Sequence, residues 1–196
     1  MNVQVKSSTG ITLVPIESRL MANRKIFIEG EIDTNSACEF TRKVMLLNYE
    51  DVQKPIDVLI NTSGGEINSG LLIYDVIQSS CAPIRMFCIG KAYSMGAVLF
   101  ACGNHGRYML PHAELMIHEP LLGNQVGGSS SSIKSISDSL LEIKEKLNQI
   151  LVKHTGKNKE EIEQATSYDH FFSPEESISF GLCDKIIGFD KIMEDL

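Results

Sequence analysis

The stretch IDVLINTSGGEINSGLLIYDVIQSSCAPIRMFCIG, residues 56–90, indicates the fold class of this chain. It begins with a short, mostly apolar run at 56–61 that is typical of a buried strand. A glycine-containing turn at 62–65 and an amphipathic helix from about Glu66 follow, and a proline marks the end of that helix. The last seven residues form a second apolar run, which predicts another strand. This order of strand, helix and strand predicts an α/β fold with parallel strands.

The same alternation continues on both sides of this stretch. Residues 25–32 (KIFIEGEI) alternate as a half-buried strand does, and the Asp-Thr pair after them offers capping groups for a helix. Small and apolar residues at 92–103 predict a fully buried helix. Short strands are expected at 107–110 and 115–117.

A long helix is predicted from about Ser132 to Thr155, because apolar residues repeat there at steps of three and four. Gly156 is a typical helix stop. The low-complexity segment GNQVGGSSSS at 123–132 precedes the helix, and we expect it to be mobile or ligand-dependent. The apolar face of the helix is consistent with burying a partner, and packing within the chain would explain it equally. With no repeat or interdomain linker, the pattern indicates a single α/β domain with a largely parallel sheet.

Composition excludes several classes of protein. The chain has 196 residues, of which 43% are hydrophobic and 22% charged, as expected for one folded domain with a real core. No apolar run reaches the roughly 20 residues of a membrane span, and no leader-like pattern opens the chain, so we expect neither a membrane protein nor a secreted one. A net charge of −7 without a basic stripe argues against nucleic-acid binding.

The five cysteines are odd in number and have no CxxC spacing. This pattern argues against a zinc site and against a disulfide framework. We therefore expect the cysteines to be free, buried thiols in a reducing cytosol.

Two segments place glycine between a strand and a helix, Ser63-Gly64-Gly65 and the run AYSMG at 92–96. Ligands of α/β sheets bind where strands end and helix N-termini present free N–H groups. Either segment alone is explained as a tight turn. Neither matches GxxxxGK[ST] or GxGxxG, so a nucleotide site is not indicated.

Ser94 and His118 are the residues that ordinary chemistry would pair as nucleophile and base. Ser94 opens the helix predicted from the second segment, where a hydroxyl commonly serves as an N-cap. His118 follows a short apolar strand and is expected at a sheet edge, and taken alone it reads as a half-buried, satisfied histidine. His154, near a helix end, reads as a solvated partner of the helix dipole. A nucleophile also needs an acid to orient its base, and the residues alone do not identify that acid.

Several segments resemble the Clp protease proteolytic subunit family, ClpP. The three that resemble its signature regions are AYSMG at 92–96, MIHEP at 116–120 and YDHFFSPEES at 168–177. They are collinear with weaker matches, and together they make the resemblance highly specific over residues 18–187. The weaker matches are SRL at 18–20, INTSGG at 60–65 and FGLCD at 180–184.

The resemblance implies a serine endopeptidase. It implies Ser94 as nucleophile, His118 as general base and Asp169 as the acid that orients the base. It assigns the oxyanion hole to the backbone N–H groups of Gly65 and Met95. No metal and no organic cofactor is implied, because ATP is used by a partner of the family's members and not by this subunit.

The resemblance also implies a fold and an assembly. The fold is the ClpP/crotonase-type spiral of ββα units, with an N-terminal axial hairpin at 1–20 and a globular head at 21–122 and 156–196. A handle, made of a strand and a helix, is expected to protrude at 123–155. Family members stack two heptameric rings into a tetradecamer, and an AAA+ Clp-type unfoldase threads unfolded polypeptides into its chamber. We therefore expect a cytoplasmic homo-oligomer that contacts neither nucleic acid nor membrane.

Four departures from the family pattern suggest a divergent member. Ser63 stands where a proline is usual, and Tyr168 stands where an arginine usually precedes Asp169. The handle segment is longer and rich in serine, and Asp57-Val58-Leu59 replaces a surface strand whose tyrosines dock the unfoldase. Two alternatives stay open. One is a catalytically weak ring subunit that needs a paralogue or an activator, and the other is a crotonase-type acyl-CoA enzyme, which needs no serine nucleophile.

Overall fold

A computed structural model describes residues 1–8, 10–123 and 127–193. Its strands are β1 (Asn2–Ser7), β2 (Gly10–Pro15), β3 (Lys25–Ile32), β4 (Ile56–Gly65), β5 (Ile84–Tyr93), β6 (Arg107–Met109), β7 (Glu114–Ile117), β8 (His170–Phe172) and β9 (Lys185–Ile186). Its helices are α1 (Ile16–Ala22), α2 (Thr34–Glu50), α3 (Ile67–Ser79), α4 (Met95–Ala101), α5 (Ser130–Thr155), α6 (Lys159–Thr166), α7 (Pro174–Phe180) and α8 (Phe189–Met193).

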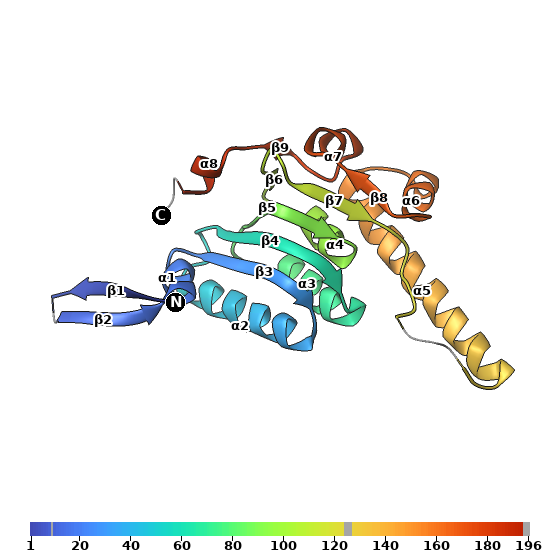
Figure 1. Ribbon diagram of the computed structural model, residues 1–196, viewed down its shortest axis with the longest axis horizontal. Helices are drawn as coiled ribbons and strands as arrows, with labels where there is room; N and C mark the ends of the chain where they lie inside the picture. Colours follow the sequence, from blue (N-terminus) through green and yellow to red (C-terminus); the bar gives the residue numbers. More distant parts are fainter. Residues whose placement is uncertain (9, 124–126, 194–196) are drawn as a thin grey trace.

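The main sheet is largely parallel and branches at β5 (Figure 1). Strands β3, β4, β5, β6 and β9 are neighbours in that order, and each neighbouring pair is parallel. The first half of β5 pairs with β6, and its second half pairs with β7, also in parallel. Strand β8 then pairs with β7 in the antiparallel direction. The predicted α/β class with a largely parallel sheet is confirmed.

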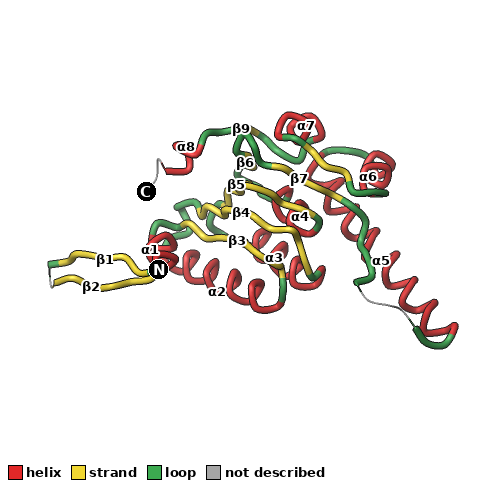
Figure 2. The backbone as a smooth tube through the Cα atoms, in the orientation of Figure 1, coloured by secondary structure: helices red, strands yellow, loops and turns green. Residues whose placement is uncertain are grey.

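Helix α4 lies in the middle of the core. All of its residues are buried, and it packs against β4, β5, α3 and α5. Helices α2 and α3 cover the same face of the sheet (Figure 2). The buried face of α2 is formed by the alanine and the large apolar residues spaced three and four apart along it. Ser94, which precedes α4, is only half-buried, so it lies where the core meets the surface.

Two predicted boundaries are wrong, and both errors have one cause. We expected β4 to end at 61 and a helix to begin at 92, but β4 continues to Gly65 and β5 continues to Tyr93. The second half of each strand is held by pairing with a neighbour, β3 for β4 and β7 for β5. Glycine and alanine are poor strand formers by themselves, so the sequence alone gave no sign of this pairing.

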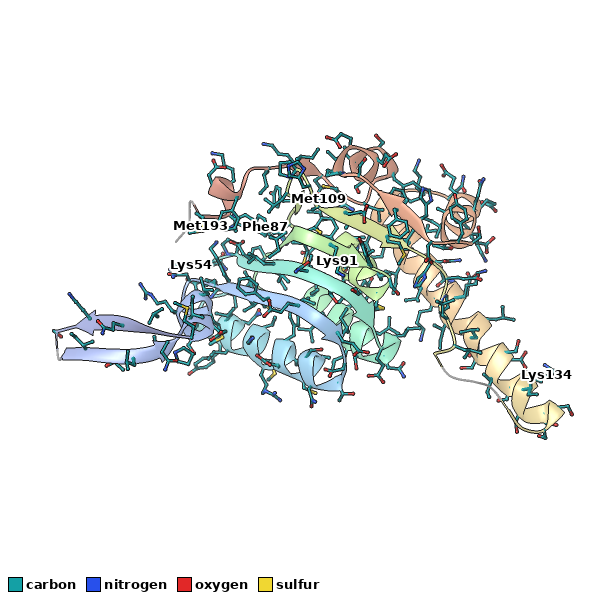
Figure 3. The ribbon with its side chains drawn as sticks, viewed as in Figure 1. Lys54, Phe87, Lys91, Met109, Lys134 and Met193 are labelled. Atoms are coloured by element: carbon teal, nitrogen blue, oxygen red, sulfur yellow. The ribbon has the colours of Figure 1, made fainter. Side chains whose placement is uncertain are left out.

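Two elements extend from the body on opposite sides (Figure 1). The antiparallel hairpin β1–β2 lies within the expected segment 1–20, and Thr9 lies outside the described residues. Helix α5 reaches away from the sheet, with Lys134 near its far end (Figure 3). The structure assigns no strand to the described residues between β7 and α5. Residues 124–126, in the expected handle strand and the segment expected to be mobile, lie outside the described residues.

The apolar face of α5 is only partly covered by the chain itself. Leu147, Ile150 and Leu151 are buried near its C-terminal end. In the N-terminal half, Ile133 is 47% exposed, and Ile136 and Leu140 are only half-buried. Packing within the chain therefore accounts for the second half of the face and covers the first half only in part.

The segment Asp57-Val58-Leu59 is not at the surface, contrary to the expectation drawn from the resemblance. All three residues are buried, because β4 is an inner strand between β3 and β5. The carboxylate of Asp57 pairs with Lys25 Nζ at 2.8 Å and with Arg85 Nε at 2.6 Å.

The cysteines are all free, but only three of them are buried. Cys88, Cys102 and Cys183 lie in the core, whereas Cys38 is half-buried and Cys81 is exposed. Burial raises the pKa of the Cys88 and Cys102 thiols to about 12, so both stay protonated and inert at neutral pH.

Candidate active site

Ser94 lies in the tight connection between β5 and α4 and adopts a strained backbone conformation. Its φ of 54° and ψ of −122° are unusual for a residue with a side chain. Such a conformation costs on the order of 1–3 kcal/mol and persists only where the surrounding structure imposes it. The hydroxyl does not cap α4, so the N-cap interpretation is wrong. It lies instead 2.8 Å from Nε2 of His118.

The parallel pairing of β5 and β7 brings His118 to Ser94. Tyr93 is in register with Met116, and the backbone N–H of Ser94 donates to the Met116 carbonyl at 2.8 Å. Parallel strands end at the same edge of a sheet. Ser94 follows the last residue of one strand and His118 follows the last residue of the other, so their side chains meet at that edge.

Asp169 reaches the other nitrogen of the same ring through a different strand pairing. Strand β8 runs antiparallel to β7 with Ile117 opposite His170, and one further step of this register places Asp169 opposite His118. The carboxylate oxygen Oδ1 lies 2.9 Å from His118 Nδ1. The His118 side chain is 15% exposed, whereas the Asp169 side chain is 62% exposed. The imidazole is thus held between a hydroxyl and a carboxylate.

The glycines at 64 and 65 form a bulged strand end, and the predicted tight turn is therefore wrong. Both have positive φ, 96° for Gly64 and 155° for Gly65, and the register with β3 shifts beside them. A β-carbon on Gly65 would lie 2.2 Å from the carbonyl oxygen of Ile32. Glycine is required here by conformation and by space together.

A cavity of about 410 Å³ opens beside Ser94. Gly65 and Met95 line it together with Ser94 and His118, so the residues of the expected oxyanion hole share one space with the hydroxyl. Met95 is the first residue of α4, and the first N–H groups of a helix have no acceptor within it. The other walls are mostly apolar and come largely from α4 and α5: Val98, Ile117, Ile143, Leu147 and Leu151.

Two contacts of Glu119, the residue after His118, hold this segment in place. Glu119 donates its backbone N–H to the Thr166 carbonyl at 2.7 Å, at the end of α6. Its carboxylate forms an ion pair with Lys144 of α5. The sequence analysis did not single out Glu119 or Lys144, because their contact depends on how α5 packs.

His154 is not the solvated helix-end residue that its position suggested. It is half-buried, its Nε2 lies 3.1 Å from the hydroxyl of Tyr74, and the two rings meet edge to face. Burial, together with the positive charges of Lys153 and Arg107, lowers the pKa of His154 to about 4. His154 is therefore a neutral structural histidine, and it lies outside the cavity beside Ser94.

The described residues contain neither a metal-binding cluster nor a membrane-spanning helix. No three histidine, cysteine, aspartate or glutamate side chains within 1–8, 10–123 and 127–193 are grouped so that they could bind a metal ion. Within the same residues, none of the helices combines the length and the apolar character needed to cross a bilayer.

The three side chains Ser94, His118 and Asp169 are brought together, and Gly65 and Met95, the residues expected to form the oxyanion hole, line the cavity beside Ser94. Asp169 and the two expected backbone donors were identified through the resemblance only. The cavity also contains a buried amide, Asn148, which the sequence analysis missed. The sequence carried little signal of this burial, because a rotation of about 100° per residue sets Asn148 to one side of the stripe that contains Ile143, Leu147 and Ile150.

Comparison with known families agrees with this arrangement. The family model described as Clp protease matches residues 8–190, which is nearly the whole chain. The match includes both glycine segments and all three side chains of the site. This chain therefore belongs to the Clp protease family, a family of peptidases that are generally of the serine type.

Proposed function

We propose that this chain is a serine endopeptidase subunit in which Ser94 is the nucleophile, His118 the general base and Asp169 the orienting acid. One observation carries the proposal. The imidazole of His118 lies 2.8 Å from the Ser94 hydroxyl and 2.9 Å from the Asp169 carboxylate, on opposite ring nitrogens. A nucleophile, a base and an acid in this chain of contacts perform acyl transfer in unrelated folds.

The proposed reaction begins with attack on the scissile carbonyl. With its proton on Nδ1 directed to Asp169, His118 accepts the Ser94 proton at Nε2 as Oγ bonds to the carbonyl carbon. The backbone N–H groups of Gly65 and Met95 would stabilise the oxyanion, and such a donor is worth roughly 2.7–4 kcal/mol. His118 returns the proton to the leaving amine, and the C–N bond breaks. Water, deprotonated by His118, then releases the acid and restores Ser94.

This chemistry uses only the chain's own groups. The proposal includes no metal and no organic cofactor, and it assigns ATP use to a partner. Cytoplasmic location and the absence of nucleic-acid and membrane partners remain part of the same proposal.

The proposed assembly is two stacked heptameric rings that receive unfolded polypeptides from an AAA+ Clp-type unfoldase. Membership of a family whose members typically form rings and work with Clp unfoldases supports this. So do the exposed apolar residues on α5, Ile133 and Leu141, and those on α2, Met45 and Tyr49. Exposed apolar side chains gathered on protruding or outer helices are typical of surfaces that a neighbouring subunit covers.

The test is intact-mass spectrometry after incubation with a fluorophosphonate, with wild type beside Ser94→Ala. We expect one adduct on wild type and none on Ser94→Ala, because only an activated serine beside oxyanion donors reacts at a useful rate. A second control is His154→Gln, which changes a histidine remote from the cavity and should leave the adduct unchanged. An adduct on Ser94→Ala, or none on wild type in any assembly state, contradicts the proposal.

A second candidate is a subunit with weak activity until a partner covers its site. The observation that favours it is the exposure of Asp169, whose side chain is 62% accessible in the single chain. Water competes for an exposed carboxylate and weakens its hold on the base. Comparing the rate of the same adduct with and without a candidate paralogue or unfoldase separates the two, since a subunit active alone gives equal rates.

A further inference from the structure

Tyr93, the last residue of β5, makes two side-chain contacts that join the three strands of the candidate site. Its ring meets the ring of Phe171 edge to face, with 5.7 Å between the ring centroids. Its hydroxyl donates a hydrogen bond to the carboxylate of Glu114 at the start of β7. Strands β5, β7 and β8 lie side by side, so these contacts reach from the first strand to the third (Figure 1).

The two rings meet over the middle strand. Met116 of β7 is in register with Tyr93 on one side and with Phe171 on the other. Residues directly opposite each other project from the same face of a sheet, so the three side chains form one row. Met116 is only 7% exposed although Phe171 is 49% exposed, which fits two rings that lean toward each other across the methionine.

This row lies outside the main core. Ala92 is fully buried and points toward α4, where its β-carbon lies 3.9 Å from one placed on Gly96. Side chains alternate between the two faces of a strand, so Tyr93 projects from the face opposite α4. Removing the Tyr93 ring therefore leaves the packing of α4 intact.

The Tyr93 ring is held in one orientation by its other neighbours. The hydrogen bond to Glu114 raises the pKa of the Tyr93 hydroxyl to about 12, so the hydroxyl remains a donor at neutral pH. Lys91 Nζ lies 5.3 Å from the centroid of the same ring, within range of a cation–π contact. The ring thus presents a fixed surface to Phe171.

The partner of this ring stands close to the acid of the proposed mechanism. Phe171 follows Asp169 by two residues, and Asp169 directly precedes β8. Strand β8 has only three residues, and within the described part of the chain it pairs with β7 alone. The Asp169 side chain is 62% exposed. With so little backbone pairing and burial, a side-chain contact on β8 matters for where the carboxylate lies.

We infer that Tyr93 is a positioning residue that acts through Phe171 on Asp169. The ring contact holds the start of β8 so that the carboxylate stays on Nδ1 of His118. The inference rests on the proposed peptidase function, in which this carboxylate orients the base. Without the ring contact, the pairing of β5 with β7 still holds Ser94 beside His118, and only the acid loosens. Turnover then falls while substrate binding changes little.

The test measures kcat and KM for hydrolysis of a fluorogenic peptide by the full chain. We expect kcat to fall about 3- to 10-fold in Tyr93→Ala with little change in KM, the range of one aromatic pair. Tyr93→Phe keeps the ring and loses only the bond to Glu114, so it should retain most of the activity. Phe171→Ala breaks the same contact from its exposed side and should match Tyr93→Ala, which keeps the test valid if Tyr93→Ala folds poorly.

The same substitution in a chain that already carries Asp169→Asn separates positioning from a general loss of structure. If Tyr93 acts through the acid, Tyr93→Ala lowers kcat no further in that chain, because the two changes remove one function. A general loss of structure lowers kcat by the same factor in both chains.

Tyr74→Ala is the matched control. Tyr74 also meets an aromatic ring edge to face at 5.7 Å and bonds through its hydroxyl, but its partner for both contacts is His154, outside the cavity beside Ser94. Removing this ring should leave kcat unchanged.

Four results would overturn the inference. They are an unchanged kcat in Tyr93→Ala and Phe171→Ala, an equal loss in Tyr93→Phe, an equal loss in Tyr74→Ala, and an undiminished loss in the chain with Asp169→Asn. In each case wild type still hydrolyses the peptide, so the positioning role fails and the peptidase function stands. If wild type hydrolyses no peptide in any assembly state, the peptidase function fails and the inference fails with it.

Discussion

A β-carbon placed on Gly64 would lie 2.9 Å from the β-carbon of Ser94 and 2.7 Å from the carbonyl oxygen of Tyr93. Real β-carbons essentially never come this close to such atoms. The end of β4 and the connection after β5 are therefore in direct backbone contact. The expected oxyanion donor at Gly65 and the hydroxyl of Ser94 hold their relative positions through this contact.

Gly64→Ala is expected to lower both activity and stability. The new methyl group must push the Ser94 backbone away, and the φ of 96° is itself strained for alanine. We expect kcat/KM to fall at least about 100-fold, because small displacements at a reacting centre are that costly. The free energy of unfolding should fall by about 2–4 kcal/mol.

The matched control is Gly156→Ala. Gly156 also has positive φ, at 72°, but a β-carbon there meets nothing within 4 Å. Gly156→Ala should lower the free energy of unfolding by about 1 kcal/mol and leave kcat/KM unchanged. Urea unfolding and peptide hydrolysis on both variants make the comparison, and equal effects on activity would refute the contact argument.

Replacing Ser94 separates catalysis from backbone strain. Ser94→Ala removes the hydroxyl, which makes no cap bond to α4, so stability should change by less than about 1 kcal/mol while hydrolysis is lost. Ser94→Gly also lacks the hydroxyl but adopts a φ of 54° freely. We expect Ser94→Gly to be more stable than Ser94→Ala by about 1 kcal/mol. Chemical denaturation measures this, and a less stable Ser94→Gly would show that the conformation carries no strain.

Asp169→Asn should lower kcat about 10²- to 10⁴-fold and change KM little, because an amide holds the wrong tautomer of His118. The exposure of the carboxylate, 62%, favours the lower end of that range in the isolated subunit. Tyr168→Phe, at the exposed position just before it, is the control and should keep kcat. Steady-state peptide hydrolysis measures both, and an unchanged kcat in Asp169→Asn would remove Asp169 from the mechanism.

The lowered pKa of His154 predicts that the folded chain loses stability in mild acid. Its pKa is about 4 in the folded chain and about 6.5 when unfolded, so the unfolded chain binds more protons between these values. The stability that the neutral ring contributes is complete above pH 6.5 and is lost as the pH falls toward 4. Between pH 7 and pH 4.5, wild type should lose about 1–2 kcal/mol more than His154→Gln. Urea unfolding at both pH values measures the difference, and equal losses would contradict the assignment.

Local sequence patterns predicted most of the secondary structure. The strand predicted at 25–32 has those limits in the structure, and the long helix begins at Ser130, two residues before the predicted start. Periodicity and caps act within a few residues, so the sequence reports them directly. The predicted boundaries were wrong where pairing with a neighbouring strand lengthens an element. Ala92 belongs to β5 because it pairs with β7, and Gly64 belongs to β4 because it pairs with β3.

The sequence by itself determined the α/β class and the serine and histidine at strand ends, and its family resemblance singled out Asp169. Only the tertiary structure decided that these side chains meet. Ser94 contacts His118 because β5 and β7 are parallel neighbours, and His118 contacts Asp169 because β8 reverses direction beside β7. The tertiary structure also decided which amide is buried in the cavity, since that depends on how α5 packs against α4. Strand order and helix packing join residues far apart in the chain, and no local pattern of side chains encodes those distances.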